Sequence, residues 1–275
     1  MTGVRTQART GAPAAVDTAP LRALIFDVDG TLADTEEGHR QAFNAAFRLH
    51  GLGWSWSVSE YAQLLQVTGG KERIGAYIER LAPTDPARRR PDVVAAIHAT
   101  KSAAYRELVA RGALPLRAGV RRLIREARAD GLLLAIASTT SPGNVAALLE
   151  SQLPAMAGGW FDVIATGDVV ARKKPAPDIY RLALKQLGVR ADEAVAFEDS
   201  MIGVQAAKAA GLFTFAVPSS WTADQDLAAA DVTLASLGDP DQPLPECDAW
   251  RIGASCLGIE ELRTLHRASR RGGPP

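Results

Sequence analysis

Two carboxylates stand two residues apart, at Asp27 and Asp29, in the segment 27–31 (DVDGT). Because alternate side chains of an extended chain point to the same side, both carboxylates can face one pocket. A calcium-binding loop also begins Asp-x-Asp, but it requires Gly at its sixth position and Glu at its twelfth. The sixth position here is Leu32, so a calcium loop is excluded. We therefore interpret Asp27 and Asp29 as a pair of carboxylates suited to nucleophilic or acid–base chemistry.

Three further segments supply groups that would bind a phosphate. Ser138 and Thr139 follow an apolar run just before a helix, where hydroxyls and free backbone N–H groups suit an anion. In segment 173–178 (KKPAPD), two prolines stiffen a short loop and hold Lys174 in place. Glu198 and Asp199 end another apolar run. Taken singly, each has a simple alternative, namely a helix cap or a solvated lysine, but together they form one coherent set.

The charges of this set indicate a metal-assisted reaction. Asp27, Asp29 and Asp199 would place three negative charges beside a phosphate dianion, and Mg²⁺ together with a lysine would supply the opposite charge. Mg²⁺ favours oxygen ligands, with waters and a substrate phosphate completing its shell. The combination predicts phosphoryl transfer through an aspartyl-phosphate.

The elements that must position these residues alternate between strand and helix. Helices are expected at 120–130, 177–187 and 202–210, between short apolar runs that read as buried strands, at residues 21–28, 132–138, 161–166, 194–198, 213–217 and 231–235. This alternation predicts an α/β fold with a doubly wound, Rossmann-like parallel sheet, because parallel strands need crossover connections. Ligands of such sheets collect at the carboxyl ends of the strands, where the acids and hydroxyls stand.

The chain between the first and second strands is different in kind. Residues 35–112 show apolar spacing of three and four throughout, which predicts an all-helical domain inserted into a core made of 21–34 and 113–237. Residues 1–20 lack the apolar stretch of a signal peptide and are expected to be a disordered extension. Residues 238–275 form a tail in which 259–268 is the expected helix.

Composition excludes several classes of partner. Thirty-one Lys and Arg balance thirty-one Asp and Glu, which removes the electrostatic argument for nucleic acid or an anionic membrane. No apolar run approaches the ~20 residues of a membrane-spanning helix, and the two cysteines lie near the C-terminus. We therefore expect a cytoplasmic protein with a small-molecule substrate. A monomer is compatible with the sequence, which does not define the oligomeric state.

The order DxDGT, Ser/Thr after a strand, KPxPD and an acid pair resembles the haloacid-dehalogenase (HAD) superfamily of phosphatases, and the helical insert resembles its C1 cap. Segments 33–39 (ADTEEGH) and 68–74 (TGGKERI) resemble the CbbY-like subgroup, whose members are associated with the Calvin cycle and xylulose-1,5-bisphosphate phosphatases. One departure stands out: many superfamily members carry another acid after the fourth motif, where Gly203 and Val204 stand here.

The resemblance implies a role for each core residue. Asp27 would be the nucleophile, and Asp29 the general acid and base, with a pKa raised by crowding against Asp27. Mg²⁺ would be held by Asp27, Asp29 through its backbone carbonyl, and Asp199, with Glu198 as a direct ligand or an outer acceptor. The transferring phosphate would be bound by Ser138, Thr139 and Lys174.

The helical insert should contact the rest of the substrate. Lys71 and Arg73, in a glycine-containing loop, are the candidates for a second phosphate, with a solvated helix start as the alternative. Glu36 and His39 share a helix face and are expected to contact substrate hydroxyls, although His39 could be structural. Other residues are assigned to the core of the insert (Trp54, Trp56, Tyr61) or to its surface (His98, Lys101, Arg106).

The expected function is therefore a Mg²⁺-dependent phosphatase acting on a sugar bisphosphate, with xylulose-1,5-bisphosphate first. Phosphoglycolate phosphatase and a β-phosphoglucomutase-like mutase use the same chemistry and remain alternatives. A catalytically silent phosphate-binding protein is the alternative from another class, and the intact Asp27, Asp29, Lys174 and Asp199 count against it.

Overall fold

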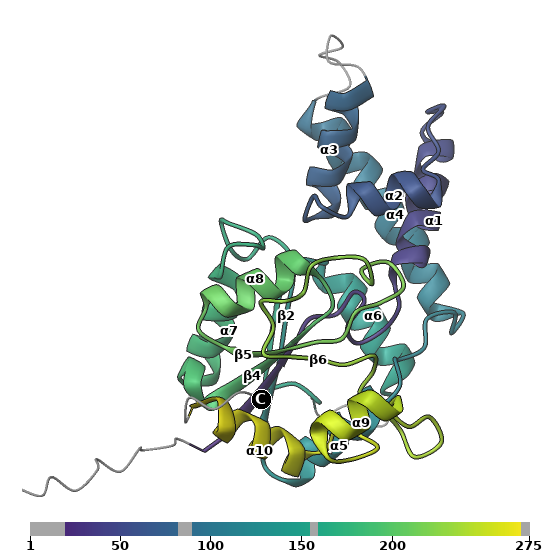
Figure 1. Ribbon diagram of the computed structural model, residues 1–275. Helices are drawn as coiled ribbons and strands as arrows, with labels where there is room; N and C mark the ends of the chain where they lie inside the picture. Colours follow the sequence, from purple (N-terminus) through teal and green to yellow (C-terminus); the bar gives the residue numbers. More distant parts are fainter. Residues whose placement is uncertain (1–19, 82–89, 155–158, 271–275) are drawn as a thin grey trace, which may run out of the picture.

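The computed structural model describes residues 20–81, 90–154 and 159–270 of the 275-residue chain. Most of the expected N-terminal extension lies outside these described residues. Figure 1 shows the arrangement: a sheet with its covering helices forms one body, and helices of the inserted segment lie beside it. Within the described residues, no helix is long and apolar enough to span a bilayer.

The sheet consists of six parallel strands in the order β3-β2-β1-β4-β5-β6. The order places β1 at the centre and reverses direction there, which confirms the doubly wound α/β fold. The strands are β1 (Ala23–Phe26), β2 (Leu133–Ser138), β3 (Val163–Thr166), β4 (Ala194–Glu198), β5 (Phe213–Ala216) and β6 (Val232–Thr233). All six match expected positions, although β6 is much shorter than predicted.

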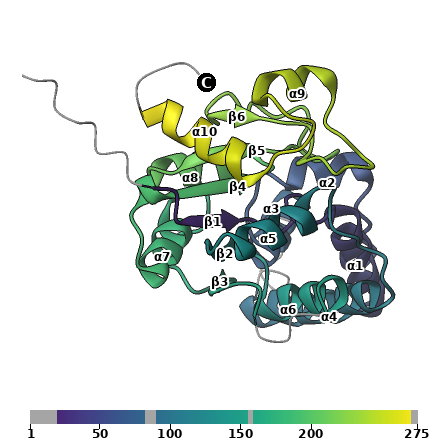
Figure 2. The same cartoon turned by 90° about the horizontal axis from the view of Figure 1, so that it is seen from below.

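Alternating side chains of the central strand serve two separate cores. Ala23 and Ile25 pack with helices α7 (Asp178–Leu187) and α8 (Met201–Ala209) on one face of the sheet. Leu24 and Phe26 face the opposite side, which is covered by α5 (Val120–Ala129), α6 (Pro142–Gln152) and α10 (Ile259–Arg270). Figure 2 separates α7 and α5 across the strands. Burial on both faces explains why the strands read as continuous apolar runs.

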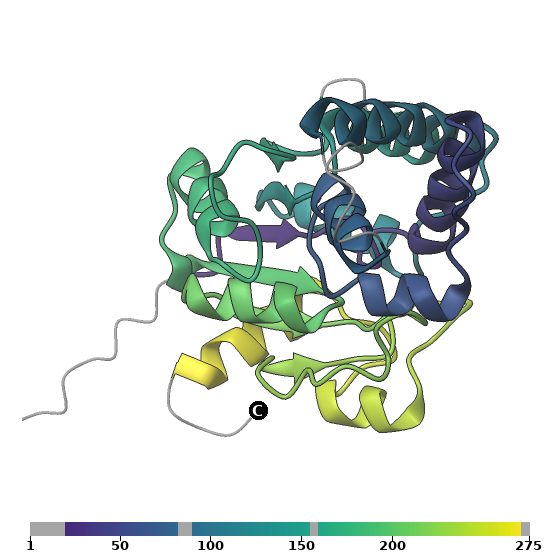
Figure 3. The ribbon, with the colours of Figure 1, turned by 90° about the horizontal axis from the view of Figure 1, so that it is seen from above.

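The inserted segment contains four described helices, α1 (Glu36–Leu49), α2 (Val58–Leu64), α3 (Gly70–Leu81) and α4 (Pro91–Ala110). They enclose an aromatic core of their own, made of Phe43, Phe47, Trp56, Tyr61 and Tyr77. In Figure 3 the arrowhead of β1 points toward these helices. The insert therefore stands at the carboxyl ends of the strands, while the domain boundaries at 34/35 and 112/113 stay a prediction.

The structure corrects two local expectations. Residues 70–73 are the first turn of α3 rather than a loop, so Lys71 and Arg73 have helical neighbours. The C-terminal segment contains a short helix, α9 (Glu246–Ile252), which was not expected, whereas α10 covers the expected 259–268 and extends to Arg270. A short 3-10 turn (Ala191–Glu193) completes the described elements.

Candidate active site

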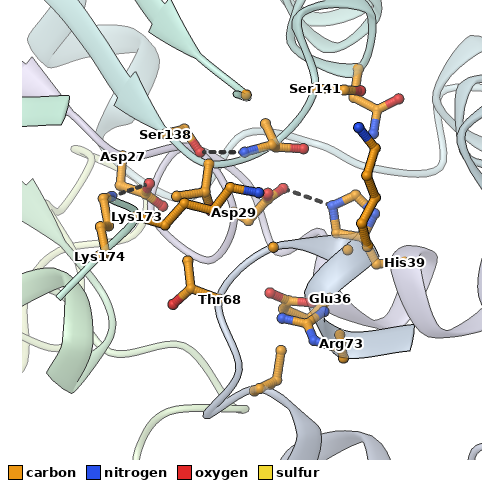
Figure 4. Close-up of a pocket in the computed structure, with 18 of the residues that line it drawn as sticks. Asp27, Asp29, Glu36, His39, Thr68, Arg73, Ser138, Ser141, Lys173 and Lys174 are labelled. Carbon is orange, nitrogen blue, oxygen red and sulfur yellow. Dashed lines mark hydrogen bonds and ion pairs between the residues drawn. The ribbon is translucent and has the colours of Figure 1, made fainter. Parts of the chain in front are cut away.

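A cavity of about 460 Å³ lies between the strand ends and the insert. Asp27 and Asp29 reach it from the segment after β1, Ser138 and Thr139 from the end of β2, and Asp199 from the end of β4. Helices α1, α3 and α4 line its other side, including Glu36, His39, Lys71 and Arg73. Figure 4 shows side chains from both sides converging on this space. Every predicted site residue except Glu198 lines the cavity, and Glu198 contacts the lining residue Lys174.

Lys174 is a buried lysine beside the loop that carries Asp27. Its Nζ donates to Asp27 Oδ1 at 2.6 Å and to Glu198 Oε1 at 2.5 Å, and the Tyr180 hydroxyl donates to the same Glu198 oxygen at 2.5 Å. Burial lowers the pKa of Lys174, but attraction to Asp27 and Glu198 outweighs it and raises that pKa above its ordinary value. Lys174 therefore stays charged and fixed beside Asp27.

Gly203 accounts for the position of Glu198. A Cβ at Gly203 would lie 1.8 Å from Glu198 Oε2, so only glycine leaves room for this carboxylate. Sequence comparison with the superfamily marks Gly203 as a missing acid; in the structure the position accommodates an acid from the neighbouring strand. Tyr180, which was not predicted, completes the contact to Glu198.

Three buried acids lie close together at the strand ends, and two of them, Asp27 and Glu198, contact Lys174. Asp27, Glu198 and Asp199 each offer a carboxylate oxygen, and these oxygens lie within 4.8 Å of one another. Burial, followed by repulsion from Glu198 and Asp29, raises the pKa of Asp27 from 3.8 to about 7 despite the attraction of Lys174. Burial and the charges of Glu198 and Asp27 also raise the pKa of Asp199. Three carboxylates beside Lys174 leave an excess of negative charge, and such a cluster of oxygen ligands fits a divalent cation.

Asp199 is held by hydroxyls that sequence reasoning missed. Ser219 Oγ and Thr222 Oγ1 each donate to Asp199 Oδ2 at 3.1 Å. The same oxygen lies close to Gly30, whose φ is +82° and whose added Cβ would lie 2.0 Å from Asp199 Oδ2. The glycine of the DxDGT segment therefore permits both the turn and the close approach of Asp199. In the sequence, the only indication of this contact was that two hydroxyl residues, Ser219 and Thr222, follow the apolar run of β5.

Asp29 connects the core to the insert. Its Oδ1 accepts from Thr35 Oγ1 at 2.6 Å and from His39 Nε2 at 2.9 Å, while Lys101 Nζ donates to His39 Nδ1 at 2.8 Å. Because the ammonium can only donate, His39 carries its proton on Nε2. Figure 4 shows the contact between Asp29 and His39. Lys101 is thus a buried residue of the site, which corrects its assignment to the surface.

These contacts set the charge of Asp29. Burial raises the pKa of the Asp29 carboxyl, but the attraction of His39, the hydrogen bonds from His39 and Thr35, and the charge of Lys101 together hold it well below its ordinary value. The expectation that crowding by Asp27 raises this pKa is therefore wrong for this conformation. Burial lowers the pKa of Lys101 to about 8.

Lys71 and Arg73, the predicted ligands of a second phosphate, already bind other groups of the protein. Arg73 donates to the Tyr61 hydroxyl at 2.8 Å and to the Leu64 carbonyl at 3.1 Å, and Tyr61 in turn donates to Glu36 Oε2 at 2.7 Å. Lys71 pairs with Asp168, a residue of the loop after β3, at 2.8 Å. Arg73 therefore orients Glu36 through Tyr61, and Lys71 joins the insert to the core.

Residues at the start of α6 and on α4 line the same cavity and carry buried polar atoms without a partner in the described chain. Ser141 is the N-cap of this helix but makes no capping hydrogen bond. Among the described residues, no partner is found for three buried atoms, Ser141 Oγ, Asn144 Oδ1 and Ser102 Oγ. Arg106 of α4 also lines this end of the cavity, and no acid in the described chain pairs with it. The arrangement is suited to an anion, because it joins a helix N-terminus to the Ser141 and Ser102 hydroxyls, and Asn144 can donate through Nδ2 although its Oδ1 only accepts.

The fold and the site define a class of hydrolase, and family comparison agrees. Residues 21–211 match the model of haloacid dehalogenase-like hydrolases, and the chain belongs to this family. The family and its phosphatase members identify this chain as a phosphatase.

Within the family, the similarity to CbbY proteins is extensive. The chain is 47% identical to CbbY of Cupriavidus necator over 227 residues, which are 82% of this chain and 89% of that protein. It is 48% identical to CbbY of Rhodobacter capsulatus over 82% of this chain and 98% of that protein. A crystal structure of CbbY from Rhodobacter sphaeroides with phosphate superposes with a TM-score of 0.74 at 49% identity, covering 78% of this chain and 94% of that one. A variant of the same protein has been solved with xylulose-(1,5)bisphosphate. The predicted identification as a CbbY-like phosphatase is confirmed.

Proposed function

We propose that this protein is a Mg²⁺-dependent phosphatase that hydrolyses a sugar bisphosphate, with xylulose-1,5-bisphosphate as the expected substrate. One observation carries the proposal: a single cavity is lined by the Asp27–Lys174 centre and, separately, by Ser141, Asn144 and Ser102, whose side chains carry buried polar atoms with no partner in the described chain. A bisphosphate places one phosphate at each. The complex of a related CbbY with xylulose-(1,5)bisphosphate supports this assignment.

The first half of the reaction forms an aspartyl-phosphate. The Asp27 carboxylate attacks phosphorus, the bond from phosphorus to the sugar oxygen breaks, and Asp29 donates a proton to that oxygen. Lys174, Ser138 and Thr139 bind the phosphoryl oxygens. Asp29 must be protonated at this stage, and the negative charge of an incoming phosphate dianion raises its pKa in the required direction.

The second half returns Asp27 to its starting state. Asp29, now a carboxylate fixed by Thr35 and His39, takes a proton from water. The oxygen of that water attacks phosphorus, the acyl-phosphate bond breaks, and inorganic phosphate leaves. The contacts that lower the pKa of Asp29 favour its carboxylate form before water is activated.

Mg²⁺ would be held by Asp27, Asp199 and the backbone carbonyl of Asp29. When bound, it would neutralise charge on the transferring phosphoryl group and orient that group. We assign Glu198 a different role: its contacts to Lys174 and Tyr180 make it the anchor of the lysine.

The second phosphate is assigned to the start of α6 rather than to Lys71 and Arg73. The Gly143 N–H, the Ser141 and Ser102 hydroxyls and the side-chain Nδ2 of Asn144 can donate there after side-chain rotation, whereas Pro142 has no N–H and the Asn144 N–H is bonded to the Ser141 carbonyl at 3.0 Å. Arg106 is exposed and can approach a phosphate bidentately. Between the two phosphates, Glu36 and His39 face the space for the sugar hydroxyls.

A substrate panel tests the proposal. With Mg²⁺ present, we expect kcat/KM for a ketopentose bisphosphate to exceed that for phosphoglycolate and for hexose phosphates. Asp27→Asn should abolish turnover while circular dichroism remains unchanged. A preference for phosphoglycolate would overturn the bisphosphate assignment, and conversion of a hexose 1-phosphate to its 6-phosphate would indicate a mutase. A folded wild-type protein with no turnover of any compound would support the silent binding protein.

A further inference from the structure

Arg117 lies in the return segment between α4 and α5, and its side chain is only 10% exposed. Its guanidinium donates to three backbone carbonyls, those of Gly30, Val217 at 2.6 Å and Pro218 at 2.8 Å. Its Nε lies 3.5 Å from Asp34 Oδ1. One side chain therefore attaches to the nucleophile loop, to the segment after β5 and to the linker that enters the insert.

The contact to Gly30 fixes the loop that carries Asp29. The Gly30 N–H donates to the Ala33 carbonyl at 2.9 Å, while Arg117 binds the Gly30 carbonyl. Because each peptide unit is planar, these two bonds set the planes on both sides of Gly30. The first of those planes contains the Asp29 carbonyl, which is one of the proposed metal ligands.

The contacts to Val217 and Pro218 fix the other side of the metal site. These residues immediately precede Ser219, which donates to Asp199 together with Thr222. Trp221, in the same segment, packs edge-on against the Tyr61 ring of the insert with 5.5 Å between centroids. A shift of the 217–218 backbone would therefore move the hydroxyls that hold Asp199.

Both linkers to the insert also meet at this point. Ala33 and Leu116 form an antiparallel bridge, and the Arg117 N–H donates to the Leu32 carbonyl at 2.9 Å. The covalent connections between core and insert are thus paired beside the guanidinium. No atom of Arg117 lines the active-site cavity; the residue instead borders an outer cleft of about 540 Å³ that also contains Arg121 and Arg125.

We propose that Arg117 is a positioning residue that sets the separation and orientation of the Asp27–Asp29 loop relative to Asp199. It thereby controls metal affinity and the chemical step without contacting the substrate. The planar guanidinium fork can bind several carbonyls at fixed angles, whereas the single ammonium of lysine cannot. This inference rests on the proposed function only for its kinetic part, because metal binding is measured without substrate.

The variants Arg117→Met and Arg117→Lys test the inference, with Arg121→Met as the matched control from the same outer cleft. Mn²⁺ binding is measured by titration calorimetry on protein whose circular dichroism matches wild type. We expect both Arg117 variants to bind Mn²⁺ about 10- to 100-fold more weakly, as is usual for residues that orient metal ligands. We expect kcat to fall on the order of 100-fold with KM for a small phosphate ester nearly unchanged. Arg121→Met should match wild type in every respect.

Chemical rescue separates positioning from general destabilisation. The outer cleft bordering Arg117 gives a small cation access to the vacated position, so non-denaturing guanidinium should restore part of the Mn²⁺ affinity and kcat of Arg117→Ala. The same salt should not rescue Asp27→Asn. A folded Arg117→Lys protein with wild-type Mn²⁺ affinity and wild-type kcat would overturn the inference. If the Arg117 variants bind Mn²⁺ more weakly than wild type but the wild-type protein itself turns over no phosphate ester, the inference is sustained and the proposed function is contradicted.

Discussion

The start of α6 gives the sharpest prediction about substrate choice. Replacing Asn144 by Ala removes a side chain that is 2% exposed, whose Oδ1 has no partner within the described chain and whose Nδ2 can donate to a phosphate. Because no existing bond of that oxygen is broken, we expect little loss of stability. A hydrogen bond to a charged group contributes about 1.5–3 kcal/mol, which corresponds to a loss of about 10- to 150-fold in kcat/KM for a bisphosphate.

The assay compares two substrates on each variant. For Asn144→Ala and Arg106→Ala, we expect kcat/KM to fall for a ketopentose bisphosphate and to stay within about twofold of wild type for phosphoglycolate, which has no second phosphate. Arg106 is exposed, so its effect should lie at the lower end of the range. Lys71→Ala is the matched control, because its ammonium pairs with Asp168. Equal losses on both substrates, or a larger bisphosphate-specific loss in Lys71→Ala, would refute the assignment.

Three other outcomes follow from the geometry. Gly203→Ala would place a Cβ 1.8 Å from Glu198 Oε2 and displace the carboxylate that anchors Lys174. We expect kcat to fall on the order of 100-fold. Full activity in the folded variant would contradict this role of Glu198. Asp168→Asn removes the partner that Lys71 and Lys173 share. Exposed pairs contribute about 0.2–1 kcal/mol, so activity should change by less than about fivefold, and the lysines at the cavity, left without this partner, should make KM for an anionic substrate depend more on ionic strength than in wild type; an unchanged salt dependence would contradict this. Burial raises the pKa of Asp27 from 3.8 to about 7 in the metal-free protein, so its stabilisation is complete below about pH 4 and is lost as pH rises toward 7. Urea titrations of wild type and Asp27→Asn should therefore show an unfolding free energy that falls more across this window in wild type than in the variant, because the opposing contribution of His98, whose pKa is lowered to about 4, is common to both; equal pH dependence in the two proteins would contradict the raised pKa.

The sequence defined the core of the site because each core residue follows a recognisable element. Asp27, Ser138 and Glu198 stand at or just after the ends of apolar strands, and a parallel sheet brings such ends to one edge. The alternation of strand and helix predicted the parallel sheet, whereas the order of its strands comes from the structure. Aromatic residues of the insert, such as Trp56 and Tyr61, were also assigned to its core, where they lie.

The insert was predicted less well because its contacts depend on how helices pack. The distances from Lys101 to His39, and from Arg73 to Tyr61, arise from crossings between helices that no local pattern records. The glycines at 69 and 70 suggested a phosphate-binding loop, but α3 begins at Gly70. The pKa of Asp29 was misjudged for the same reason: its opposing charges come from the insert rather than from the adjacent Asp27.

The most direct test of the central claim is to trap the phosphoryl group on the enzyme. Protein mixed with a ketopentose bisphosphate and Mg²⁺ is quenched within one turnover and treated with borohydride, which reduces an acyl phosphate to an alcohol. Peptide mass spectrometry should then find Asp27 converted to homoserine, and no conversion at Asp29, Asp199 or in the Asp27→Asn variant. Turnover of the bisphosphate with Asp27 unmodified under every quench time would contradict nucleophilic catalysis by Asp27.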